Sequence, residues 1–109
     1  MIEEALKARP GDPMFQDTLG WIFYLRGNYP KACTELRKAV QGSPQSPEIQ
    51  YHLAMAESAC GRIDLARWHH AAAVNIGKMI TSQGRPLTAE YAQVVALSQQ
   101  ALDALGPPK

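Results

Sequence analysis

The stretch Asp17–Ala32, DTLGWIFYLRGNYPKA, decides the fold. Apolar and aromatic residues recur at helical spacing around Gly20. Gly27 followed by Asn28 is typical of a helix end, because glycine adopts a positive φ angle without steric cost. Ala32 then opens the apolar stripe of a second helix. The stretch therefore predicts two helices joined by a tight turn and in close contact where glycine and alanine keep the side chains small.

The chain repeats this plan with a period of 34 residues. After a shift of one period, small residues coincide with small residues and turn residues with turn residues. The matches are Pro10 with Pro44, Pro13 with Pro47, Leu19 with Leu53, Gly27 with Gly61, Ala32 with Ala66, and Ala5 with Ala39 and Ala73. A period of this length in a helical pattern indicates stacked helical hairpins. We therefore predict an all-α chain of antiparallel helix pairs.

Start and stop signals place four helices in the two full units. The first begins at Pro13 behind the N-cap Asp12 and ends near Arg26. The others are expected at about 29–41, 47–60 and 63–76. Residues Ile2–Arg9 match the end of a second helix, so the chain is expected to begin within a repeat, as a piece of a longer protein would.

This pattern resembles the tetratricopeptide repeat, whose consensus is Trp-x2-Leu-Gly-x2-Tyr, then Ala-x3-Phe, then Ala and Pro. The first unit supplies Leu19-Gly20-x2-Phe23, Ala32-x3-Leu36, Ala39 and Pro44, with Gln16 in place of the early Trp. The second supplies Leu53-Ala54, Ala66-x3-His70 and Ala73, with Glu57 in place of the aromatic residue and Lys78 in place of Pro. The resemblance covers residues 1 to about 78 and implies a curved α-solenoid.

The last third departs from the repeat. Gly84-Arg85-Pro86 interrupts the helix that the register would start near Thr81. Apolar residues then continue at helical spacing over 87–105, with a polar outer face that suits a solenoid cap. We expect one domain over 1–109, divided into the second helix of a partial repeat (1–10), repeats at 13–46 and 47–80, and a C-terminal capping helix at 87–105.

The resemblance also implies the function, because such solenoids bind protein segments in a concave groove lined by the first helix of each repeat. The groove positions carried over by register are Met14, Asp17, Trp21, Tyr24, Glu48, Tyr51, Met55 and Ser58. Three are aromatic, as binding anchors often are, although Trp21 and Tyr24 would equally suit packing against the N-terminal helix or a neighbouring chain.

The groove positions argue against one subclass of ligand. Chaperone-binding members of the family hold a C-terminal carboxylate with Lys and Asn side chains, and no groove position here is cationic. An apolar or basic protein segment is the expected partner. The alternative function is structural, a homodimer or stacked array formed through the repeat ends.

Composition disfavours other function classes. A net charge of +1 offers no basic field for nucleic acid, and no apolar run is long enough to cross a membrane. No catalytic motif, cofactor or metal is predicted; the adjacent His69 and His70 point about 100° apart on a helix. Cys33 and Cys60 are interpreted as buried thiols of a reducing compartment. The first residues carry no export signal, so a cytoplasmic location is expected. Because no catalytic motif is found, a non-enzymatic function is expected.

Overall fold

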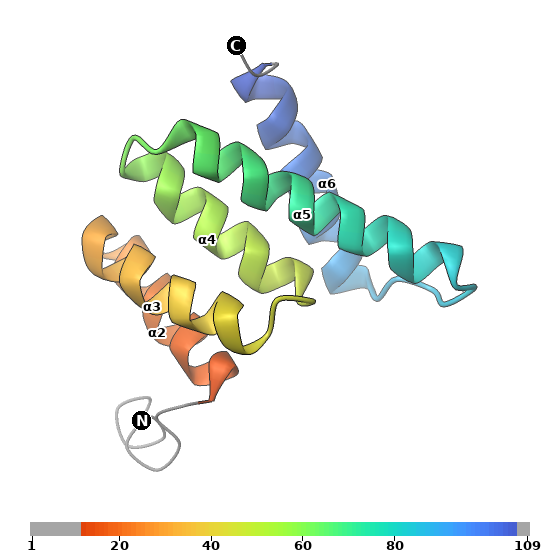
Figure 1. Cartoon of the computed structure of the whole chain (residues 1–109), viewed down its shortest axis with the longest axis horizontal. Coiled ribbons are helices and arrows are strands. Elements are labelled where there is room, and N and C mark those ends of the chain that lie inside the picture. The colour runs from red at the N-terminus through yellow and green to blue at the C-terminus, as the bar shows by residue number, and fades with distance from the viewer. Residues whose placement is uncertain (1–11, 107–109) are drawn as a thin grey trace.

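The computed structural model describes residues 12–106, which form five α-helices and, within that span, no β-strand. The helices are α2 (Pro13–Leu25), α3 (Tyr29–Gly42), α4 (Pro47–Ala59), α5 (Ile63–Ser82) and α6 (Ala89–Leu105) (Figure 1). The all-α prediction is therefore confirmed. The partial repeat expected at residues 1–10 lies outside the described residues.

Successive helices pack against one another in chain order, which gives a stacked, antiparallel arrangement. α2 packs on α3, α3 on α4, and α4 on α5, while α6 contacts both α5 and α4 (Figure 1). The first helices of the two hairpins, α2 and α4, also touch. The result is a helical-repeat solenoid with α6 across its C-terminal end.

Side-chain caps begin three of the helices. Asp12 accepts a hydrogen bond from the Met14 amide at 2.9 Å, ahead of the Pro13 that opens α2. The Ser46 and Thr88 hydroxyls accept bonds from amides in the first turns of α4 and α6. Each cap satisfies an amide that has no partner within its helix.

Glycines with positive φ end the first helix of each hairpin. Gly27 has φ 81° and Gly61 has φ 80°, and a Cβ at either position would meet open space. Their role is therefore conformational, since the left-handed backbone closes the helix with a bond from the Asn28 amide to the Phe23 carbonyl. An equivalent bond joins Arg62 to Glu57.

The small residues of the repeat lie where helices approach most closely. A Cβ added to Gly20 would lie 2.6 Å from Leu36 Cγ, so α2 and α3 are in contact at this point. Ala32, Ala39 and Ala66 are fully buried. The close approach predicted from the sequence is thus confirmed.

In the C-terminal part, the helix bounds differ from those predicted from the sequence. α5 continues to Ser82, past the end expected near Ile76, because no glycine turn or proline follows before Gly84. The longer helix gives α6 a surface to pack on: a Cβ at Gly77 would lie 2.7 Å from Val95 Cγ2. α6 starts at Ala89 behind its Thr88 cap, two residues after the expected start.

Candidate functional site

Aromatic side chains from α2 and α4 gather on one face of the molecule. Trp21 stacks on Tyr24 with ring centroids 4.6 Å apart and planes 6° apart. It also stacks on His52 of α4 at 4.1 Å, and Tyr51 lies beside it at 6.4 Å. These four residues, all half-buried, are called the aromatic cluster below. The structure therefore brings together three of the predicted groove residues from two different helices.

The buried carboxyl group of Asp17 supports the aromatic cluster by pairing with His52. Asp17 is 3% exposed, and its Oδ1 lies 2.7 Å from Nδ1 of His52. A carboxylate removed from water needs such a partner, because an unpaired buried charge is costly. Asp17 was predicted to line the groove, but it lies beneath the surface and orients the His52 ring. The sequence did not single out His52 for this role.

Glu48 adds a second acidic group next to this pair. Asp17, Glu48 and His52 offer ligand atoms that lie within 4.8 Å of one another, a donor set that a divalent cation accepts. Two of the three already satisfy each other through the Asp17–His52 bond. The grouping therefore gives this end of the face an acidic character.

The remaining predicted positions extend the face along the same two helices. Met14 is 57% exposed at the start of α2. Met55 and Ser58 are half-buried further along α4, one and two turns beyond Tyr51. The predicted residues thus form a band on α2 and α4 that combines apolar, aromatic and acidic side chains.

Comparison with protein families identifies the repeat. Residues 20–56 match the family model described as TPR repeat, from Gly20 in α2 through α3 to Ala56 in α4. The matched segment belongs to the tetratricopeptide repeat (TPR) family. No curated protein and no solved structure matches the chain. Within residues 12–106, no helix combines the length and hydrophobicity that a bilayer span requires.

TPR modules are in general scaffolds for protein–protein interaction, and the match supports that broad role for this chain. In the TPR arrangement the aromatic cluster lies on the first helices of two neighbouring units, α2 and α4. Its residues are therefore fixed relative to one another by the stacking of the units.

The contact between α4 and α5, within the second helical hairpin, is partly polar. Glu57, at a position where the consensus has an aromatic residue, is 1% exposed, and its Oε1 lies 3.4 Å from Nε2 of His69. Burial raises the pKa of Glu57 to about 7, and the nearby Arg37 opposes this rise. His69 also bonds Gln50 through Nδ1 at 2.7 Å, and burial lowers the His69 pKa.

His70 connects the second TPR unit to α6. Its Nδ1 lies 3.3 Å from the Ser98 hydroxyl, and both residues are buried. Burial, assisted by the neighbouring His69, lowers the pKa of His70 to about 4. The histidine is therefore neutral over the physiological range. His69 and His70 have separate partners, in keeping with their predicted divergence along the helix.

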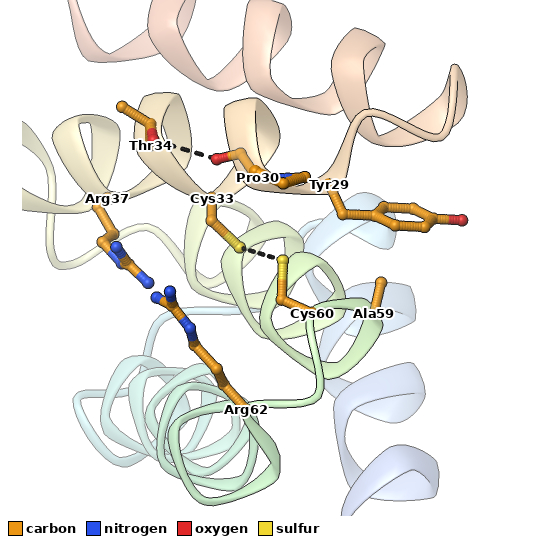
Figure 2. A pocket seen from close by; sticks show the side chains of 8 residues that line it. All are labelled: Tyr29, Pro30, Cys33, Thr34, Arg37, Ala59, Cys60 and Arg62. Carbon is orange, nitrogen blue, oxygen red and sulfur yellow. Dashed lines mark hydrogen bonds between the residues drawn. The ribbon is translucent and has the colours of Figure 1, made fainter.

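A pocket that the sequence did not indicate lies beside α3. This open pocket of about 460 Å³ is lined by Tyr29, Pro30, Cys33, Thr34, Arg37, Ala59, Cys60 and Arg62 (Figure 2). Cys33 and Cys60 occupy different positions in the 34-residue repeat, so alignment of the two repeats does not indicate that they are close in space. Stacking of one unit on the next brings their Sγ atoms to 3.4 Å.

Proposed function

We propose that the chain is a protein-interaction module that binds a protein segment in a groove on the α2–α4 face. The aromatic cluster carries this proposal. Three large side chains from two helices stand half-exposed on it, and they are fixed by stacking and by the Asp17–His52 bond. Rigid aromatic anchors contribute most where little side-chain entropy remains to be lost on binding.

The domain organisation that we propose has one TPR-like domain with repeats at 13–46 and 47–80 and a capping helix at 87–105. The observed helix pairs α2–α3 and α4–α5 and the position of α6 support it. Ser98 of α6 bonds His70 of α5, so the last helix closes the polar end of the second unit.

The chemistry of the face favours an apolar or basic segment. Glu48 supplies negative charge at the surface, whereas the buried Asp17 is already paired with His52, and the band of eight groove positions contains no lysine or arginine. A ligand with a Lys or Arg beside an apolar anchor would match both the Glu48 carboxylate and the aromatic rings. A segment that ends in a free carboxylate would meet like charge.

The two tryptophans of the chain make a direct test possible. Trp68 on α5 is 71% exposed and lies outside the aromatic cluster. In a Trp68→Phe variant, Trp21 is the single indole reporter. We expect its fluorescence to shift on titration with basic-apolar peptides and to stay unchanged with matched acidic peptides. A preference for acidic C-termini would refute the proposed ligand chemistry.

A capture experiment with the full chain addresses the face itself. Trp21→Ala should abolish retention of the bound protein, whereas Trp68→Ala should leave it intact. Both variants remove the same side chain, so their difference reports location. Retention lost with Trp68→Ala alone would place the binding surface on α5 and overturn the groove proposal.

The alternative function, self-association into a homodimer, is favoured by one observation. Trp68 stands largely exposed beside Ala71, Ala72 and Asn75, which together form a small, mainly apolar hollow on α5. Sedimentation velocity over a range of concentrations tests it. A dimer that Trp68→Glu converts to monomer would support this function; a wild-type chain that stays monomeric at high concentration would exclude it.

A further inference from the structure

The two cysteines of the chain form a close pair between the TPR units. Cys33 lies in the first turns of α3 and Cys60 is the C-cap of α4, and their side chains point toward each other across the interface (Figure 2). The two Sγ atoms are 3.4 Å apart. A disulfide needs about 2.05 Å, so closure requires a movement of only about 1.4 Å.

The pair is accessible from one side. Cys33 is buried, at 3% exposure, whereas Cys60 is partly exposed and lines the open pocket. Burial, together with the hydrogen bond to Cys60, raises the pKa of Cys33 to about 12, so this thiol keeps its proton at neutral pH while the pair is reduced. The roles differ accordingly: Cys60 meets a reagent first, and Cys33 is placed behind it.

The pocket next to the thiols has a positive character. Arg37 and Arg62 extend toward each other beside the cysteines (Figure 2), and no acidic residue lines the pocket. The Nη2 atom of Arg37 is buried and has no hydrogen-bond partner among the described residues. An unsatisfied guanidinium group of this kind is a ready donor for a carboxylate.

We propose that Cys33 and Cys60 are a redox-active thiol pair, and that a small anionic disulfide bound beside Arg37 and Arg62 oxidises them to a bond between α3 and α4. Glutathione disulfide is the probe that represents this chemical class. Its carboxylates would meet the two guanidinium groups while its sulfur–sulfur bond faces Cys60.

The chemistry proceeds in two exchange steps. Cys60, as the thiolate, attacks one sulfur of the disulfide; the sulfur–sulfur bond breaks, and one glutathione thiolate leaves and takes up a proton. Cys33 then attacks the Cys60 sulfur while its proton passes to the departing second glutathione, which leaves as the thiol. Overall, two cysteine thiols lose two hydrogen atoms and two electrons, and one disulfide becomes two thiols.

Closure would add a covalent bond between two units that otherwise meet through packing and the Asp17–His52 bond. The residues joined are 27 positions apart and belong to neighbouring TPR units. A bridge of this kind restricts the unfolded chain and holds α3 against α4. The oxidised chain should therefore unfold at a temperature higher by on the order of 10 °C.

The test incubates the full chain with defined ratios of reduced to oxidised glutathione, followed by alkylation of free thiols and intact mass measurement. We expect a monomer that loses two hydrogen atoms and both alkylation sites, and that dithiothreitol restores. Cys33→Ser should stop at one glutathione adduct on Cys60. A wild-type chain that keeps both thiols, accumulates the adduct without closing, or forms only intermolecular bonds overturns the proposal.

The role of the arginines has a separate readout. Arg62→Gln should slow oxidation by glutathione disulfide on the order of threefold and leave oxidation by the neutral hydroxyethyl disulfide unchanged. Because both disulfide reagents are tested on the same variant, a general loss of stability would change the two oxidation rates in the same direction. If the substitution changes the rates of oxidation by the two reagents equally, the proposed anion-binding role of the arginines is wrong. The thiol pair itself is tested by the mass measurement.

Discussion

The two helical hairpin units, α2–α3 and α4–α5, have the same backbone plan but fill it differently. In the first, Phe23 and Leu36 pack around Gly20 in an apolar contact. At the equivalent places the second carries Glu57 and His70, each almost fully buried. The comparison teaches that the small residues and turns of the repeat set the hairpin, whereas the larger positions also accept polar groups. His70 lies within hydrogen-bond distance of Ser98, while Glu57 Oε1 lies 3.4 Å from His69 Nε2 without a hydrogen bond among the described residues.

This difference has an energetic consequence. An apolar contact has no requirement beyond shape, so the first unit should respond to volume alone. A buried polar contact also requires its partner and a protonation state, so the second unit should respond to pH and to the presence of α6. Four predictions separate the two behaviours.

The largest effect is expected from Leu36→Ala. Leu36 is fully buried between α2 and α3, and its truncation leaves a cavity next to Gly20. The free energy of unfolding, measured by urea denaturation, should fall by about 3 kcal/mol at every pH from 5 to 8. A strong pH dependence of this loss would contradict the description of the contact between Gly20 and Leu36 as apolar.

The second prediction concerns Glu57, whose folded-state pKa is raised from 4.5 to about 7. The folded chain then binds this proton more tightly than the unfolded chain does, so the contribution of Glu57 to stability falls as pH rises from about 4.5 to 7. Glu57→Gln removes that fall. From pH 4.5 to pH 7, the unfolding free energy of the variant should therefore increase by about 2 kcal/mol relative to that of the wild type.

His70 gives the opposite sign and serves as the control. Its pKa is lowered from 6.5 to about 4, so the unfolded chain binds the proton more tightly, and stability from this group rises between pH 4 and 6.5. Glu57→Gln should retain this rise. A variant curve parallel to the wild-type curve would show that Glu57 does not titrate in the folded chain.

The third prediction uses Gly20→Ala. A methyl group there would meet Leu36 Cγ at 2.6 Å, although the second unit has Ala54 at the same place. We expect a loss of about 1–2 kcal/mol in unfolding free energy despite the better helix propensity of alanine. Combined with Leu36→Ala, the cost of Gly20→Ala should largely disappear, since the clash is removed. Additive losses would contradict a steric cause.

The smallest effect is expected from making the second unit resemble the first. His70→Leu removes the partner of the buried Ser98 hydroxyl and should cost about 1 kcal/mol. His70→Leu with Ser98→Ala replaces both polar groups and should recover the wild-type unfolding free energy. A double variant that is no more stable than the single one would show that the hydrogen bond is not what couples α5 to α6.

Local chemistry made much of the fold predictable. The Asp12 cap with Pro13, the positive-φ glycines and the alanine stripe each act within one hairpin, so their meaning can be read from spacing alone. The same patterns were sufficient to indicate the TPR family and the helices that carry the aromatic cluster. The extension of α5 was not predicted: Gly77 directly follows the expected end at Ile76, yet it stays helical where α6 packs against it.

The sequence by itself therefore determined the helices of the repeat up to about Ile76, where each hairpin turns and which small residues face a neighbour, because these follow from backbone conformation and a period of 34 residues. Only the tertiary structure decided that Asp17 holds His52, that Glu57 meets His69 and that Cys33 lies against Cys60. Each of these contacts joins two different helices, and the offset between packed helices is set by packing across the whole interface, which no local spacing encodes.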